Sequence, residues 1–150
     1  MERIITSKPI YPGTGYFPQG TIIFTDQGGL VVNRVLKLKW THALIYLGGD
    51  IWEATWPRVK RSTTYKHVRC TMVAPLLALD WEAMKALAEE NEGRRYSATG
   101  YFRPELYNKT PGIYCSQFVA MLLEAGGSKI TVEDGRDPDI LYTAITGRKP

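Results

Sequence analysis

Hydrophobic residues recur at helical spacing immediately after Cys115. The apolar stripe consists of Phe118, Val119, Leu122 and Leu123, and its period is that of an α-helix with one buried face. Pro111-Gly112 interrupts the chain just before it. The pattern predicts an amphipathic helix that starts at Cys115 and ends at Gly126-Gly127.

Short β-branched and aromatic runs elsewhere predict strands. Gly-Gly suits a tight turn with positive φ angles, so the run around Gly48-Gly49 predicts a hairpin. The predicted strands are residues 21–25, the two hairpin arms 41–47 and 50–54, and residues 64–73.

Two further helices have recognisable starts. Asp80 has the character of an N-cap for a helix over residues 81–91 that ends at Gly93. Pro138 suits the first position of a short final helical turn. Residues 30–38 fit a short helix slightly better than a strand. Residues 1–18 contain Pro9, Pro12, Gly13, Gly15 and Pro18, and we expect an irregular lead-in there.

Strands and helices are segregated along the chain rather than alternating, which favours an α+β fold. With 150 residues the simplest organisation is one domain over residues 1–150. The composition, 44% hydrophobic and 23% charged, is that of a globular protein.

Charge and cysteine content exclude several function classes. The net charge of +4 is mildly basic, and no nucleic-acid-binding motif accompanies it, so we do not expect a nucleic-acid partner. Two cysteines without a Cys-x-x-Cys pair indicate neither a zinc site nor a disulfide framework. We expect no metal and no transmembrane segment. The first residues lack the apolar core of a signal peptide, so the expected location is the cytosol or a particle assembled there.

The candidate chemistry centres on Cys115. The start of a helix favours a thiolate over a thiol, because free backbone N–H groups and the positive end of the dipole lie there. A nucleophilic cysteine also needs a base, and only His42 and His67 supply an imidazole. We expect His42 to be that base and His67 to be exposed.

The orienting acid depends on the hairpin register. With Gly48 and Gly49 as the loop, His42 and Glu53 are diagonal neighbours about 7–8 Å apart at the backbone. A loop shifted to Gly49-Asp50 stretches the separation to about 13 Å. The sequence leaves both registers open.

These motifs, in the order histidine, acid, cysteine, resemble the circularly permuted papain-like amidases of the NlpC superfamily, the YiiX/YaeF-like branch. The segments that carry the resemblance are 41–48 with 51–54 (the histidine hairpin) and 114–119 (the nucleophile helix). Residues 19–24 resemble the family's opening strand, although Thr21 stands where an aspartate is common, and residues 138–141 resemble its closing turn.

The resemblance implies a small antiparallel sheet or barrel packed against the Cys115 helix. It also implies a Cys115–His42–Glu53 triad that attacks a peptide amide or a lipid acyl bond without a cofactor, as a hydrolase or acyltransferase. For such an enzyme without a signal peptide, the alternative to the cytosol is delivery by a phage particle or a lysis system.

Several residues carry a second interpretation. Tyr114 and Ser116 flank the nucleophile and are expected to contact substrate, and Trp52 either lines a substrate cleft or belongs to the core. Cys70 lies on the apolar phase of its strand and is expected to be core. The alternative function is a catalytically inactive binding module with a basic face of Arg58, Lys60, Arg61, Lys66 and Arg69.

Overall fold

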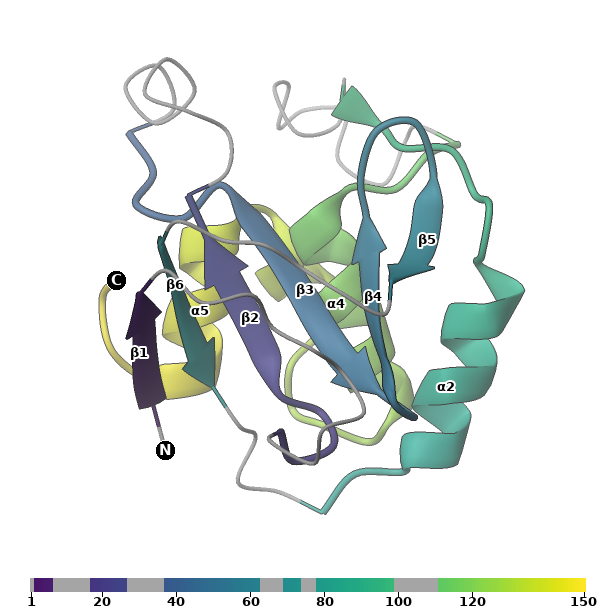
Figure 1. The fold of residues 1–150 in the computed structure, drawn as a ribbon, viewed down its shortest axis with the longest axis horizontal. Helices are drawn as coiled ribbons and strands as arrows, with labels where there is room; N and C mark the ends of the chain where they lie inside the picture. The colour runs from purple at the N-terminus through teal and green to yellow at the C-terminus, as the bar shows by residue number, and fades with distance from the viewer. Residues whose placement is uncertain (1, 7–16, 27–36, 63–68, 74–77, 99–110) are drawn as a thin grey trace.

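The computed structural model describes residues 2–6, 17–26, 37–62, 69–73, 78–98 and 111–150. Its centre is a six-stranded sheet in the order β1-β6-β2-β3-β4-β5, and every neighbouring pair is antiparallel (Figure 1). The strands are β1 (Glu2–Thr6), β2 (Ile22–Thr25), β3 (His42–Leu47), β4 (Asp50–Ala54), β5 (Val59–Ser62) and β6 (Arg69–Val73). The predicted α+β class is therefore confirmed.

The irregular lead-in predicted for residues 1–18 is wrong at its start. Residues 2–6 form edge strand β1, which pairs with β6 from Glu2 opposite Val73 to Thr6 opposite Arg69. The prolines and glycines that suggested irregular structure all lie after Thr6, in a part of the chain that the structure mostly does not describe. The run Glu-Arg-Ile-Ile-Thr opens with two charged residues and gives only a weak strand signal, and it becomes a strand because β6 offers it a free edge.

The hairpin around Gly48-Gly49 is confirmed in the first of its two registers. Leu47 pairs with Asp50 and Ile45 with Trp52, so the two glycines form the loop between β3 and β4. Both glycines have positive φ, 61° and 93°, as a tight primed turn requires.

In the described residues, three α-helices follow the strands, and Figure 1 shows α4 and α5 behind the sheet with α2 beside β4 and β5. They are α2 (Trp81–Glu90), α4 (Cys115–Ala125) and α5 (Pro138–Thr146), with a 3₁₀ turn η2 (Val132–Gly135) before the last. Asp80 caps α2 as predicted, by accepting a hydrogen bond from the Ala83 N–H at 2.9 Å. Pro138 opens α5, which runs for nine residues rather than the short turn expected.

Both faces of the central strands are buried. The larger core lies between the sheet and the helices and includes Phe24, Trp52, Met84, Phe118 and Leu122. A smaller cluster on the other face contains Ile23, Leu44, Tyr46, Ile51 and Cys70. Cys70 is 3% exposed, which confirms its assignment to the core.

Some predictions fall outside the described residues. These are the short helix over 30–38 except its last two residues, the first half of the strand over 64–73, and the exposure of His67. Conversely, strand β5 was not predicted. Among the helices of the described ranges, none is long and apolar enough to cross a membrane.

Candidate active site

The β3–β4 hairpin brings His42 and Glu53 into direct contact. His42 is the first residue of β3, and Glu53 lies near the end of the antiparallel strand β4. The ring nitrogen Nε2 of His42 lies 2.6 Å from Oε2 of Glu53, a short, charge-assisted hydrogen bond. The side chains are 10% and 4% exposed, so little water competes for this bond. The side chains of His42 and Glu53 therefore bridge the backbone separation that was expected for the Gly48-Gly49 loop.

Helix α4 places Cys115 at the same end of the sheet. Cys115 is the first residue of the helix, as predicted, and its N–H belongs to the first turn, whose donors have no partner within the helix. The side chain of Gln117 accepts a hydrogen bond from the Tyr114 N–H at 3.4 Å and so closes the helix start. The thiol points at the carbonyl oxygen of Thr41, the residue before His42, with a sulfur–oxygen distance of 3.9 Å.

His42 lies between a carboxylate and a sulfur. Because Glu53 occupies Nε2, the nitrogen left for Cys115 is Nδ1. Burial lowers the pKa of His42, but the charge and hydrogen bonding of Cys115, followed by those of Glu53, outweigh it and raise the pKa to about 10. As a thiol, the sulfur donates weakly to Thr41. As a thiolate, it accepts a hydrogen bond from the imidazolium. The surroundings therefore favour a protonated His42 at neutral pH.

Glu53 is charged despite its burial. Burial raises the pKa of this carboxyl, but the hydrogen bond and charge of His42, with a smaller contribution from Lys60, bring it below its usual value. The Lys60 Nζ lies 3.5 Å from Oε1, the oxygen that His42 does not use. Sequence reasoning placed Lys60 only in a basic cluster. Because strand β5 was not predicted, the sequence did not indicate that Lys60 lies opposite Glu53.

The three residues are enclosed. Cys115 is 0% exposed, Glu53 3% and His42 8%. A substrate therefore reaches the sulfur only if neighbouring groups move. The low exposure also strengthens the interactions among the three charges, since water screens them poorly.

A linking segment over residues 93–97 joins the start of β5 to the chain before α4. Its backbone bonds on one side to Pro57 and to Val59, the first residue of β5, and on the other to Ile113, two residues before Cys115. Tyr96 on this segment is another residue that sequence reasoning missed. Burial, and then the charge of Cys115, raise the pKa of the Tyr96 phenol.

The residues expected to contact substrate are buried, with polar atoms directed into the protein. The Tyr114 hydroxyl donates to the carbonyl of Arg136 at 3.0 Å, and the Ser116 hydroxyl to that of Gly135 at 2.9 Å. Trp52 is 0% exposed and belongs to the main core, which favours the second of its two interpretations. In this structure Tyr114 and Ser116 fasten the start of α4 to η2.

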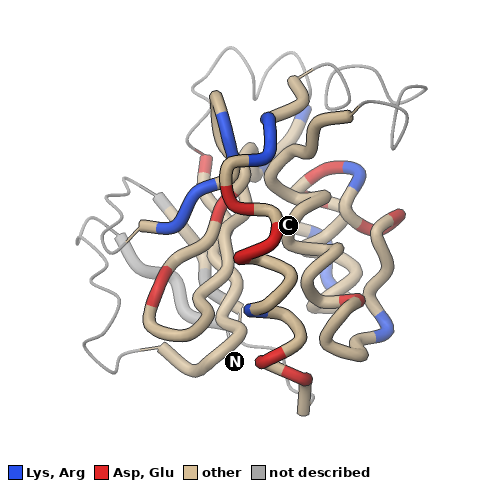
Figure 2. Tube along the Cα trace, turned by 90° about the vertical axis from the view of Figure 1, so that its right-hand side faces the viewer, with Lys and Arg blue, Asp and Glu red and all other residues tan. Residues whose placement is uncertain are grey.

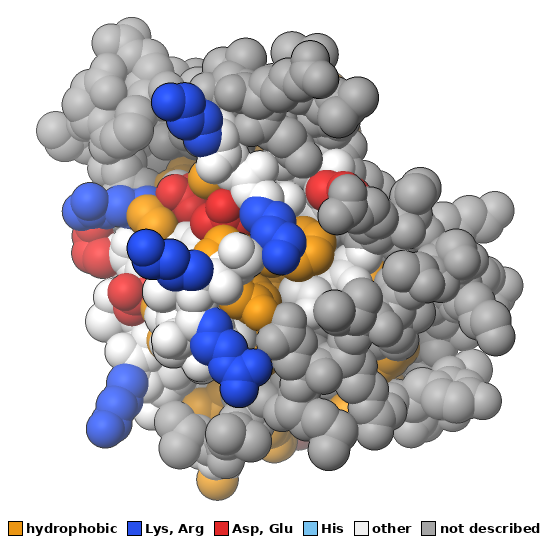
Figure 3. All heavy atoms as spheres, turned by 90° about the vertical axis from the view of Figure 1, so that its left-hand side faces the viewer, with side chains coloured by type: hydrophobic (Ala, Val, Ile, Leu, Met, Phe, Trp, Pro, Cys, Tyr) orange, Lys and Arg blue, Asp and Glu red, His pale blue; other side chains and the backbone are white. Residues whose placement is uncertain are grey.

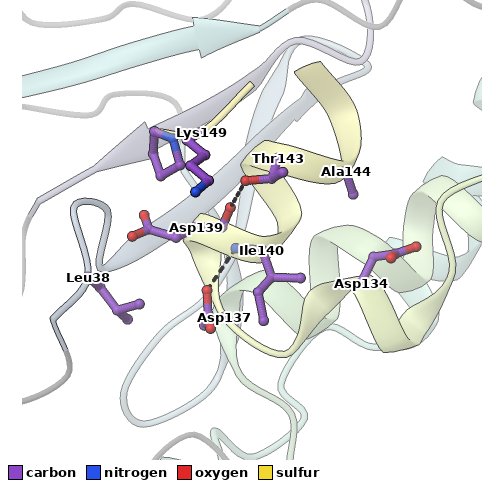
Figure 4. A pocket seen from close by; sticks show the side chains of 9 residues that line it. Leu38, Asp134, Asp137, Asp139, Ile140, Thr143, Ala144 and Lys149 are labelled. Carbon is purple, nitrogen blue, oxygen red and sulfur yellow. Dashed lines mark hydrogen bonds between the residues drawn. The ribbon is translucent and has the colours of Figure 1, made fainter. Parts of the chain in front are cut away.

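Helix α5 is hydrogen-bonded to the residues that precede His42. The two carboxylate oxygens of Asp139 accept hydrogen bonds from the Lys39 and Trp40 N–H groups, at 2.7 and 2.8 Å. Asp137, two residues earlier, instead caps its own helix by accepting from the Ile140 N–H at 2.8 Å (Figure 4). These residues also line an open pocket of about 610 Å³, together with Leu38, Asp134 and Lys149. None of the triad residues lines it, so we do not regard this pocket as the reaction site.

No group of three or more metal-ligating side chains in the described part of the chain is arranged to hold a metal ion.

The described part of the predicted basic cluster lies on a surface of mixed sign. Figure 2 shows Lys and Arg interspersed with Asp and Glu on one side, and Figure 3 shows both signs of charge on the opposite side. On β5, Lys60 pairs with Glu53, and Arg61 with Glu92 at 3.4 Å and Asp50 at 3.9 Å. Arg58 donates to the carbonyl of Gly93 at 2.9 Å. The described members of the predicted basic face are thus already engaged, and the side chains of Lys66 and Arg69 lie outside the description.

A scan against protein-family models gives no match, and searches of curated proteins and of solved structures give none either.

Proposed function

We propose that this protein is a cysteine hydrolase or acyltransferase of the permuted papain-like fold, acting on a peptide amide or a lipid acyl bond. The observation that carries the proposal is His42, held between the Glu53 carboxylate at 2.6 Å and the Cys115 sulfur at the start of α4. This arrangement supplies a nucleophile, a base and an acid that orients the base. The resemblance to the NlpC superfamily points to the same chemistry.

The proposed reaction begins with the Cys115 thiolate and the His42 imidazolium. The sulfur attacks the carbonyl carbon, and the backbone N–H of Cys115 is placed to stabilise the oxyanion at the helix start. His42 then gives its proton to the leaving amine or alcohol as the carbon–heteroatom bond breaks, which leaves a thioester. Water, or a second acceptor, loses a proton to His42, attacks the thioester and restores the thiolate.

The two cysteines offer an internally controlled test, because Cys115 and Cys70 are both buried. Iodoacetamide labelling of the folded protein at pH 7, resolved by peptide mass spectrometry, should modify Cys115 much faster than Cys70. His42→Ala should remove the difference. Equal, slow labelling of both residues, unaffected by that substitution, would contradict the proposal.

A chromogenic acyl ester such as a p-nitrophenyl ester provides the second measurement. Wild type should release p-nitrophenol with an initial burst as the thioester forms, and Cys115→Ala should not. Cys70→Ala is the matched control and should retain the burst.

The complete burial of Cys115 favours one competing function, a binding module that keeps the fold without catalysis. That module would show neither preferential labelling nor a burst. The pair of experiments therefore separates the two functions.

A further inference from the structure

The Glu53 carboxylate has two different partners, one for each oxygen. Oε2 lies 2.6 Å from His42 Nε2, and Oε1 lies 3.5 Å from the Lys60 Nζ. Lys60 is the residue of β5 directly opposite Glu53 of β4 in the sheet. Strand pairing, rather than a flexible loop, therefore brings the ammonium to the carboxylate.

Burial makes the second partner important. The Glu53 side chain is 4% exposed, whereas that of Lys60 is 55% exposed. A carboxylate with so little access to water needs a protein donor or cation for each oxygen. The Lys60 ammonium meets this need from the solvent side, while His42 meets it from within.

We propose that Lys60 is a positioning residue of this site: it holds Glu53 with Oε2 facing His42, and its charge sets the pH range in which Cys115 and His42 form an ion pair. The inference rests on the proposed function for its catalytic meaning. The predicted effect of the Lys60 charge on the Cys115–His42 pair does not depend on any substrate.

The direction of the effect follows from the charges around the pair. In the described residues, the titratable groups that act on His42 are Glu53 from β4 and Cys115 from α4, and Tyr96 of the linking segment also interacts with Cys115. Lys60 adds a positive charge on the far side of Glu53. Its removal makes the surroundings more negative, which favours the imidazolium and disfavours the thiolate. The pH range in which the ion pair forms therefore moves upward.

Arg61 is a matched control on the same strand. It carries the same charge, and its side chain is 49% exposed. It points to the other face of β5, where its ion pairs are with Glu92 and Asp50. A non-specific change in surface charge would therefore be equal for Lys60→Met and Arg61→Met.

The decisive experiment measures the rate of Cys115 alkylation by iodoacetamide against pH in wild type, Lys60→Met, Lys60→Arg and Arg61→Met. The profile of Lys60→Met should move upward by about 0.2–0.7 pH units, the size expected for one partly exposed ion pair. Lys60→Arg and Arg61→Met should match wild type. An unmoved Lys60→Met profile, or equal shifts in Lys60→Met and Arg61→Met, would overturn the inference.

A second readout separates this inference from the proposed function. The His42 ring can be titrated directly by NMR, and its pKa should rise in Lys60→Met but not in Arg61→Met. In a Glu53→Gln background the Lys60→Met shift should shrink, because the Lys60 ammonium is then no longer held beside the pair by the carboxylate charge. If Cys115 proves unreactive at every pH, the proposed function fails, and the NMR titration still decides the role of Lys60.

Discussion

The Asp139 carboxylate accepts a hydrogen bond from the Trp40 N–H at 2.8 Å, which ties the start of the C-terminal helix to the chain two residues before His42. A second bond joins the same carboxylate to the Lys39 N–H. The direction in which the chain enters β3, and hence the position of the candidate base, is thus fixed by a residue about a hundred positions later.

Asp139→Ala should weaken both the fold and the site. It leaves two backbone N–H groups without their acceptor, and we expect a loss of about 1–3 kcal/mol in the free energy of unfolding, measured with urea. Cys115 alkylation should slow as His42 loses its fixed position.

Asp137→Ala is the matched control, because it removes the cap of the same helix but touches neither Lys39 nor Trp40. It should destabilise by about 1 kcal/mol and leave alkylation of the folded protein unchanged. Equal slowing in both variants would contradict this role of Asp139.

Glu53→Gln should reduce the reactivity of Cys115 at pH 7. Without the carboxylate charge the imidazolium is less stable, so a smaller fraction of the protein holds the thiolate–imidazolium pair. A loss of one unit in the His42 pKa corresponds to about a tenfold change in that equilibrium. Labelling of Cys115 with iodoacetamide measures the effect. Glu92→Gln, which removes one of the two carboxylate partners of Arg61, should label at the wild-type rate.

Stability should depend on pH through the same pair. The pKa of His42 is raised from 6.5 to about 10 on folding, so its contribution to stability is complete below pH 6.5 and is lost as pH rises through about 10. The pKa of Glu53 is lowered from 4.5, so its contribution is present above pH 4.5 and is lost on further acidification.

Urea unfolding at a series of pH values measures both limbs. Wild type should lose stability between pH 6.5 and 10, and His42→Gln should lose much less over this interval. Identical slopes in the two proteins would show that His42 is not held in its charged form.

Gly112→Ala should destabilise the approach to the nucleophile helix. A Cβ at this position would lie 2.8 Å from the Ser97 Cβ and 3.0 Å from the Arg95 carbonyl oxygen, so the linking segment would have to move. We expect a cost of about 1–3 kcal/mol in urea unfolding. Gly126→Ala is a useful comparison, since its Cβ would meet the flexible Met84 side chain, 2.6 Å from the sulfur. A larger cost at Gly126 than at Gly112 would contradict this account.

The parts of the site that could be predicted are those encoded by local patterns. A Gly-Gly turn between two β-branched runs predicts the hairpin that carries His42 and Glu53. A proline–glycine break followed by an apolar stripe predicts the start of α4 at Cys115. In both cases a few adjacent residues contain the information, and the structure has the hairpin and the helix within a residue of the predicted bounds.

The parts that could not be predicted depend on pairing between distant segments. The five residues of β1 form a strand only because they pair with β6. The four residues Val59–Ser62, two of which are exposed cations, form a strand only because they pair with β4. The positions of Lys60, Tyr96 and Asp139 follow from such pairings. No local pattern in the sequence encodes these contacts, because they form only when distant segments pack together in the folded protein.

The candidate base and its acid come from one hairpin, whereas the thiol comes from a helix much later in the chain. His42 and Glu53 are separated by 11 positions, and the contact between Cys115 and Thr41 spans 74. Loss of long-range packing therefore parts the sulfur from the imidazole before it parts the imidazole from the carboxylate. A partly unfolded or truncated chain would keep an acid–base pair with nothing to activate, and its cysteine would behave as an ordinary thiol. The proposed activation of the sulfur therefore requires the finished fold.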